Sequence, residues 1–123
     1  HGFDDGIYAA ARLIEIVGRQ TETFADLMAE FPTSCWTPEI RVPVAESSKF
    51  HVMQNLVDEG GFGDVTITKL DGLRVDYANG WGLVRASNTT PSLTLRFEAD
   101  DEASLTEIQE IFRGQLQHHN LTF

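Results

Sequence analysis

Polar side chains with anion-binding chemistry gather in one short run of this sequence, residues 85–91. The guanidinium of Arg85 is planar and can bind two oxygens of a phosphate at once. Serine and threonine hydroxyls in the same run can donate to the remaining oxygens. Asn88 tolerates positive φ, so it can turn the backbone and direct successive N–H groups inward as an anion-binding nest. The residues predicted to bind phosphate are Arg85, Ser87, Asn88, Thr89 and Thr90.

The same residues are also ordinary loop formers, so an alternative is that the run only connects two strands. Apolar stretches flank it at 81–84 and 93–97. A polar tip between two strands is a common position for binding residues. Both readings place residues 85–91 in a hairpin loop, and they differ in whether the loop binds an anion.

Other groups that could do chemistry have simpler structural explanations. Acidic clusters at residues 4–5 and 100–102 stand at the starts of predicted helices, where carboxylates cap free N–H groups. The serines at 47–48 also precede a helix and have no neighbouring base. The histidines at 118–119 are adjacent on a predicted helix and do not face the same way. The sequence therefore predicts no catalytic residue and no metal ligand in this chain.

Composition excludes several classes of partner. The net charge of −10 over 123 residues argues against nucleic acid and against anionic membranes, which need basic patches. There is no apolar run of 18 residues. There is one cysteine, Cys35, so no internal disulfide can form, which fits a reducing cytoplasm. Cys35 lies beside Trp36 and is expected to be a packing residue. The chain starts at His1 without a methionine or signal peptide, so it is expected to be a fragment that begins within a longer protein.

Two helical patterns precede a break in the first third of the chain. Apolar residues between Ile7 and Val17 recur at helical spacing, and Gly18 follows them. A second short helix is expected over 21–30, with Thr21 as its cap. Prolines then bound residues 32–38, which indicates a linker or hinge.

The remaining residues predict an α+β fold. Residues 40–44 alternate as a strand, and Pro43 favours a sheet edge. A helix begins after residues 47–48 and ends at Gly60, and a last helix begins at Asp100 or Asp101. The further strands, separated by tight-turn signals, are 65–68, 73–77, 81–84 and 93–97. We expect an antiparallel four-stranded sheet with two helices on one face, preceded by the two short helices.

An ordered series of motifs resembles a known family. Residues 71–77 (DGLRVDY), 80–84 (GWGLV), the loop with Pro91, and 95–99 (LRFEA) resemble the α-D-phosphohexomutases, in particular the bacterial phosphomannomutase/phosphoglucomutase branch. Residues 2–8 resemble a stretch near the end of that family's third domain, so the resemblance covers nearly the whole chain. The residues at 88–90, Asn-Thr-Thr, resemble this branch, whereas phosphoglucosamine mutases more often have Gly-Thr-Glu there.

The resemblance implies a domain organisation and a role. Residues 1–31 would be the helical tail of a preceding domain, 32–38 a hinge, and 39–123 a C-terminal (fourth) domain that is similar to the TATA-binding protein in fold. The parent enzyme would interconvert hexose 1-phosphate and hexose 6-phosphate in the cytoplasm, through a phosphoserine, Mg²⁺ and a bisphosphorylated sugar. This domain would clamp the phosphate that is not reacting and would be inactive alone. Its partners would be the phosphosugar and the other domains of the parent.

Two alternatives remain at this point. The chain would be a non-catalytic acidic interaction module of α+β fold if the loop binds nothing. It would be the same domain of a phosphoglucosamine mutase if the branch is different.

Overall fold

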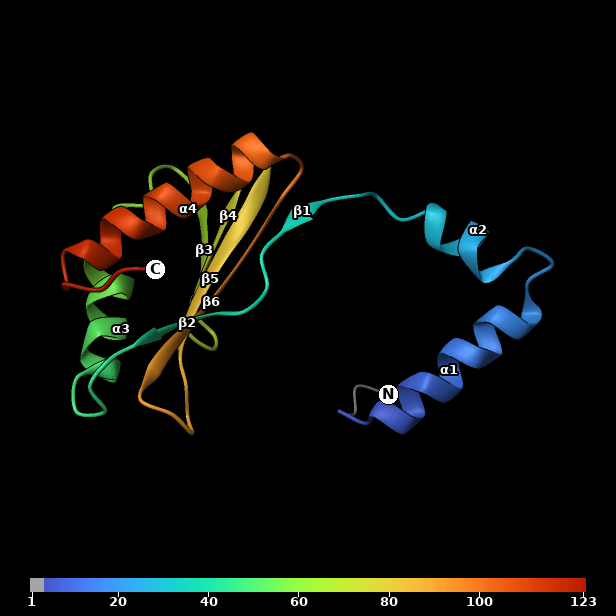
Figure 1. The fold of residues 1–123 in the computed structure, drawn as a ribbon, viewed down its shortest axis with the longest axis horizontal. Helices are drawn as coiled ribbons and strands as arrows, with labels where there is room; N and C mark the ends of the chain where they lie inside the picture. The colour runs from blue at the N-terminus through green and yellow to red at the C-terminus, as the bar shows by residue number, and fades with distance from the viewer. Residues whose placement is uncertain (1–3) are drawn as a thin grey trace. The chain divides into compact units, whose positions relative to one another are not determined.

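The structure is a computed structural model that describes residues 4–123, and the chain divides into two units, residues 1–33 and 34–123 (Figure 1). The boundary lies inside the proline-bounded stretch 32–38. No helix or strand of the described residues crosses this boundary.

The first unit consists of the helices α1 (Gly6–Arg19) and α2 (Phe24–Ala29). As expected, α1 starts at an aspartate: the Asp5 carboxylate accepts the N–H groups of Ile7 at 2.9 Å and Tyr8 at 3.0 Å. The prediction of Thr21 as the cap of the second helix is wrong, because α2 begins after Thr23. The side chains of Thr23 and Asp26 form a reciprocal capping box there, and the hydrogen bond from the Thr23 hydroxyl lowers the pKa of Asp26.

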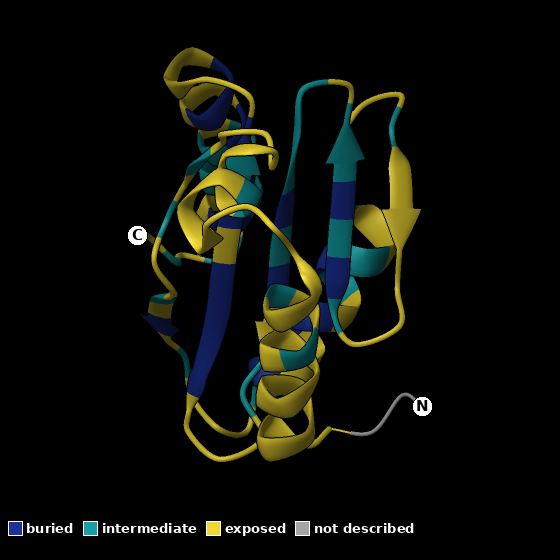
Figure 2. Cartoon of the chain, turned by 90° about the vertical axis from the view of Figure 1, so that its right-hand side faces the viewer, coloured by how far each residue is buried: buried dark blue, intermediate teal, exposed yellow. Residues whose placement is uncertain are grey.

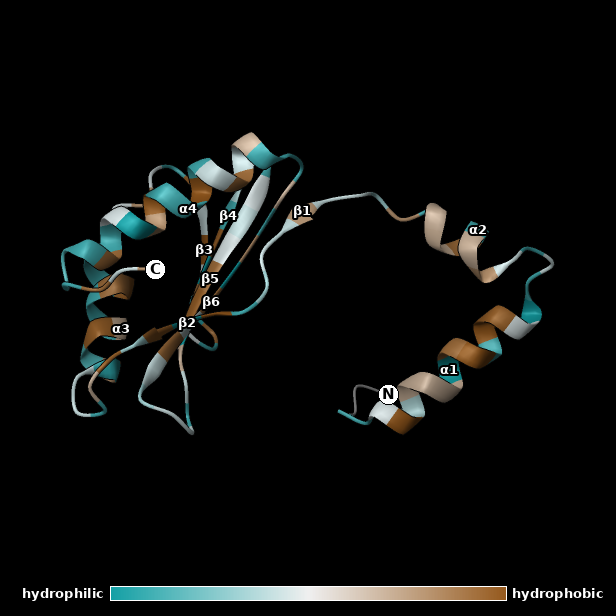
Figure 3. Ribbon diagram, viewed as in Figure 1, coloured by the Kyte–Doolittle hydropathy of each residue, from teal (hydrophilic) through white to brown (hydrophobic). Residues whose placement is uncertain are grey.

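Neither helix of the first unit buries a residue, although both carry apolar side chains (Figures 2 and 3). A single helix cannot bury an apolar face alone, and within this unit the apolar faces of the two helices stay uncovered. The large apolar residues that stay exposed are Ile7, Tyr8, Leu13, Ile14, Ile16, Phe24, Met28 and Phe31.

The second unit is an antiparallel sheet with two helices, which confirms the α+β class. The expected four-stranded sheet is wrong, because all five predicted strand segments belong to one sheet and β1 adds a sixth strand. The sheet runs in the order β1-β6-β5-β4-β3, and β2 pairs with β6 as well. Its six strands are β1 (Cys35–Trp36), β2 (Ile40–Pro43), β3 (Thr66–Thr68), β4 (Leu73–Tyr77), β5 (Gly80–Ala86) and β6 (Ser92–Ala99).

The additional strand β1 arises because two short strands follow one another along β6. Cys35 pairs with Ala99, and farther along Ile40 pairs with Leu95. Between them the Thr37 N–H donates to the Phe97 carbonyl at 3.0 Å, and the Thr37 hydroxyl accepts the Phe97 N–H at 3.1 Å. Pro38 has no N–H to donate, so regular pairing stops there. Pro43 lies on this outer strand, as its edge preference predicted.

The helices α3 (Lys49–Glu59) and α4 (Glu102–Gln117) cover one face of the sheet (Figure 1). The Asp101 carboxylate caps α4 by accepting the Ser104 N–H at 2.8 Å, and this bond lowers the pKa of Asp101. Strand residues of one parity and residues of both helices form a single core. Its buried apolar members are Val42, Val52, Met53, Leu56, Phe62, Leu73, Val75, Val84, Leu93, Leu95, Phe97, Ala99, Leu105, Ile108, Phe112 and Leu116.

The hairpin of β5 and β6 positions the polar run. Their pairing continues to Ala86 opposite Leu93, so residues 87–91 form the connection. The predicted polar tip is therefore a loop held by the two longest neighbouring strands of the sheet.

Candidate functional site

The hydroxyl of Ser87 organises the loop at residues 87–91. Its oxygen accepts the N–H of Thr89 at 3.3 Å, the N–H of Thr90 at 3.1 Å and the Thr90 hydroxyl at 2.7 Å. The Thr90 and Ser92 hydroxyls lie 2.8 Å apart, so the hydroxyls form a chain. This is a turn in which a serine side chain replaces a backbone acceptor.

The predicted positive φ at Asn88 is wrong. Among residues 4–123 the only non-glycine residue with positive φ is Asn120. The Ser87 hydroxyl supplies the turn, so Asn88 does not need the left-handed conformation. Two N–H groups that a nest would offer to an anion, those of Thr89 and Thr90, donate to Ser87 instead.

All five predicted residues line one hollow of about 330 Å³ on the rim of the sheet. The hollow is polar and lies against the open face, which α3 and α4 do not cover. The residues that line it are Glu39, Arg41, Asp71, Arg85, Ala86, Ser87, Asn88, Thr89, Thr90 and Thr94.

Arg85 is held at the edge of this hollow by a close turn. Its guanidinium lies 3.3 Å from the Asp71 carboxylate, and both side chains are well exposed, at 48% and 76%. Exposed pairs of this kind contribute little stability, so an anion can compete for Arg85. Gly72 permits the approach: its φ is +102°, and a Cβ there would lie 2.7 Å from the Cβ of Arg85.

Sequence reasoning missed a second arginine in the hollow. Arg41 pairs with Thr94 across β2 and β6, and Thr94 pairs with Arg85 across β6 and β5. The three side chains therefore share the open face of the sheet. Arg41 donates to the Glu39 carboxylate at 2.8 Å. The alternation of each strand was readable from the sequence, but the pairing of β2 with β6 was not.

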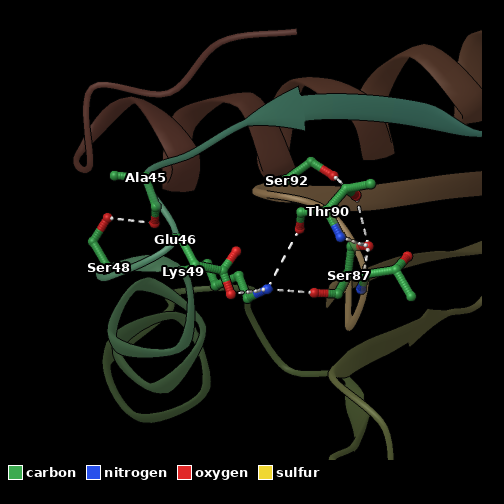
Figure 4. A network of polar contacts seen from close by, with 8 residues as sticks. Ala45, Glu46, Ser48, Lys49, Ser87, Thr90 and Ser92 are labelled. Atoms are coloured by element: carbon green, nitrogen blue, oxygen red, sulfur yellow. Dashed lines mark hydrogen bonds and ion pairs between the residues drawn. The ribbon is translucent and has the colours of Figure 1, made fainter.

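Sequence reasoning also left Lys49 without a supported role. Its side chain is only 1% exposed, and its ammonium lies beneath the loop (Figure 4). It donates to the Ser87 carbonyl at 2.7 Å and to the Thr90 carbonyl at 3.4 Å, and it pairs with the Glu46 carboxylate at 2.7 Å. A lysine at the start of a helix is slightly unfavourable for the helix dipole, and its loop partners stand about forty positions away, so no local signal indicated them.

Two other arginines lie elsewhere on the open face. Arg74 binds Asp76 at 2.7 Å, and its guanidinium stacks 4.2 Å from the Trp81 ring. Arg96 is exposed. Neither residue lines the hollow.

The remaining candidates show no arrangement for catalysis. Within residues 4–123 no group of three His, Cys, Asp or Glu side chains could hold a metal ion. Burial, followed by the carboxylate of Glu102, raises the pKa of Cys35 and disfavours a thiolate nucleophile. The Ser48 hydroxyl donates to the Ala45 carbonyl at 3.1 Å rather than capping α3. No helix in the described part of the chain is long and apolar enough to span a membrane.

Comparison with known proteins gives a consistent result. A family model described as phosphoglucomutase/phosphomannomutase, C-terminal domain, matches residues 39–115. A phosphomannomutase/phosphoglucomutase of Pseudomonas putida is 53% identical over 116 residues, which are 94% of this chain and 25% of that protein. A phosphoglucomutase of Neisseria gonorrhoeae is 43% identical over 118 residues, with the same coverage of 94% and 25%.

A solved structure agrees with these matches. It is a crystal structure of a phosphoglucomutase/phosphomannomutase family protein from Burkholderia thailandensis, with a TM-score of 0.83 and 38% identity. The match covers 100% of this chain and 26% of that one. The chain thus spans about a quarter of the length of the relatives that it matches.

Proposed function

Because this chain belongs to the phosphoglucomutase/phosphomannomutase family, we propose that it is the phosphate-binding C-terminal domain of a phosphomannomutase/phosphoglucomutase. The observation that carries the proposal is the hollow in which Arg85 and the hydroxyl-rich loop meet. Arg85 would bind two phosphate oxygens, and Ser87, Asn88 and Thr89 would donate to the others. Thr90 would join them by turning its hydroxyl from Ser87 to the phosphate. Residues 1–31 would be the tail of a preceding domain and 32–38 a hinge.

The donor inventory of the loop supports this role. The Ser87 oxygen acts as an acceptor toward Thr89 and Thr90, so its own proton is not used in these bonds and can donate to a ligand. Asn88 and Thr89 are exposed, and their side chains carry an amide and a hydroxyl that can donate. The partner of Arg85, Asp71, is 76% exposed and can turn to water when an anion arrives.

In the longer protein this domain would hold the phosphate that is not reacting. Binding energy from a remote phosphate orients the reacting end of a substrate and helps to close a cleft. The parent would interconvert hexose 1-phosphate and hexose 6-phosphate through a bisphosphorylated sugar. The described side chains do not fit Mg²⁺, so the metal and the phosphoserine would be supplied by residues outside this chain. The chain alone would be inactive, and the protein would be cytoplasmic.

Phosphate titration of the 123-residue chain tests the proposal. Amide NMR should show shifts at residues 85–90 with a dissociation constant on the order of millimolar, about 4 kcal/mol of binding free energy. Arg85→Ala should abolish these shifts, because charge-assisted hydrogen bonds are worth about 1.5–3 kcal/mol each. Arg85→Lys should restore binding only in part, since an ammonium cannot bind two oxygens in a fork.

The matched control is Arg96→Ala, which removes the same charge from the same face outside the hollow. It should keep the phosphate shifts. If Arg85→Ala kept them as well, the phosphate assignment would be wrong and the alternative of a non-catalytic acidic module would be favoured.

A further inference from the structure

Lys49 is one of the most completely buried side chains of the second unit, although it is charged. It ranks with Phe97 and Phe112 among the large side chains that are almost inaccessible to solvent. Burying an ammonium is costly unless it is paired and hydrogen-bonded. Its position at the first turn of α3 adds an unfavourable interaction with the helix dipole. A residue kept under these conditions needs a compensating set of partners.

The partners of Lys49 use the whole ammonium group. An ammonium has three N–H donors, and Lys49 has three acceptors: the Ser87 carbonyl, the Thr90 carbonyl and the Glu46 carboxylate (Figure 4). No donor is left for a ligand. Lys49 also does not line the hollow. Direct contact between Lys49 and a bound phosphate is therefore not its role.

The two carbonyls that Lys49 binds mark the two ends of the Ser87 turn. The Ser87 hydroxyl holds the N–H side of this turn, at Thr89 and Thr90, and Lys49 holds the carbonyl side. Together they attach the loop to the start of α3. Because a trans peptide is planar, the N–H of Asn88 points opposite to the Ser87 carbonyl, away from Lys49. That N–H takes part in none of the hydrogen bonds of the turn.

We propose that Lys49 is a positioning residue of the phosphate loop, an inference that rests on the proposed function. Its ammonium draws in the carbonyls of Ser87 and Thr90 and so presents the outer side of the loop, with the Asn88 N–H and the free hydroxyls, to the anion. Glu46 neutralises the buried charge and keeps the ammonium in place. Lys49 thus sets the loop geometry on which Arg85 and the hydroxyls depend.

The test replaces Lys49 by methionine, which has similar length and no donor. Inorganic phosphate, followed by amide NMR on the 123-residue chain, should bind on the order of tenfold more weakly to Lys49→Met, the size of effect seen when supporting hydrogen bonds are removed from a site. Without phosphate, the amides of Thr89 and Thr90 should exchange with solvent faster in Lys49→Met than in the wild-type chain. The amide of Phe97 should stay protected in both. Lys49→Arg should restore binding in part, because a guanidinium can still reach two carbonyls.

Two controls separate positioning from charge and from general stability. Lys69→Met removes an equal charge, at a lysine whose ammonium donates to the Val57 carbonyl at 3.0 Å rather than to the loop carbonyls. Ile108→Val weakens the core, at a residue that is 2% exposed and lies on α4 rather than on α3 or the loop. Both should leave the phosphate dissociation constant within about twofold.

The outcomes distinguish this inference from the proposed function. If the wild-type chain binds no phosphate, the proposed function fails, and the exchange of the Thr89 and Thr90 amides still decides whether Lys49 holds the loop. If phosphate binds the wild type and Lys49→Met equally well, or if the loop amides exchange alike, the inference is overturned. Should Lys49→Met not fold, Lys49→Gln provides a shorter, uncharged donor and must change binding and exchange in the same direction.

Discussion

The two faces of the sheet in residues 34–123 use the same strands for different purposes. On β6, Leu93, Leu95 and Phe97 point to the face under α3 and α4 and are buried. Their neighbours in the chain, Thr94 and Arg96, point to the open face. Side chains alternate along a strand, so every second residue faces the core and contributes to stability. The residues between them face the open side and are available for binding.

The open face also gathers nearly half of the basic residues of an acidic chain. The chain has nine Lys and Arg residues against nineteen Asp and Glu residues. Four of the nine, on β2, β4, β5 and β6, stand on the open face by register: Arg41, Arg74, Arg85 and Arg96. Three of these arginines are paired with carboxylates, so an anion has to compete with a carboxylate for them. We therefore expect substitutions on the core face to lower stability and substitutions on the open face to weaken binding, each with little effect on the other property.

The largest effect is expected from a neighbouring pair on β6. Leu95→Ala should lower the free energy of unfolding by about 2–5 kcal/mol, because it leaves a cavity at a residue that is 0% exposed. Arg96→Ala, one residue along and on the other face, should change it by less than about 0.5 kcal/mol. Urea unfolding of the two variants measures the difference. Equal losses would mean that the open face contributes to stability in a way that its exposure does not indicate.

A smaller effect is expected where the sheet meets α4 most closely. A Cβ on Gly82 would lie 2.4 Å from the ring of Phe112, and that ring is held by Phe62 and Phe97 at 5.1 Å each. Gly82→Ala should therefore cost about 1–3 kcal/mol by overpacking.

Gly114→Ala is the matched control, since nothing lies within 4 Å of its added Cβ on α4. It should stabilise the chain by up to about 1 kcal/mol through helix propensity. Thermal unfolding of both variants would show opposite shifts in Tm. A stabilised Gly82→Ala would mean that Phe112 has room to move.

The fold could be predicted where apolar residues recur at a clear spacing, every second residue in a strand or every three to four in a helix. Alternation at 93–97 and 73–77 indicated strands, and Gly60 indicated the end of a helix that stops at Glu59. The two residues of β1 carry no readable period, so their pairing with β6 was not predictable. The cap of α2 was misassigned although the sequence carries the signal: Thr23, unlike Thr21, is followed three residues later by an acidic residue, Asp26, which completes a capping box.

The candidate site was predictable in composition but not in its supports. The arginine and hydroxyls of the loop were found because they are neighbours in sequence. Three residues reach the hollow or the loop from other elements: Arg41, Asp71 and Lys49. Long-range pairing brings them there, and that pairing could not be predicted from the sequence. The conformation of Asn88 was misjudged because the residue type permits positive φ, while the Ser87 hydroxyl removes the need for it.

We propose that this domain binds the phosphate group and hardly distinguishes the sugars that carry it. The loop offers donors suited to an anion. Glu39 and Asp71 also line the hollow, so any preference for one sugar would have to arise from these two carboxylates. A domain that holds either end of a bisphosphorylated sugar has to accept both phosphate positions.

Titration of the chain with glucose 1-phosphate, glucose 6-phosphate and mannose 1-phosphate, followed by amide NMR, tests this claim most directly. We expect shifts of the same amides, at residues 85–90, with dissociation constants within about threefold of one another, which is less than about 1 kcal/mol. Binding should weaken with added salt, as expected for an exposed charged site. A preference of about tenfold for one sugar or one phosphate position would contradict the account, because the domain would then recognise more than phosphate.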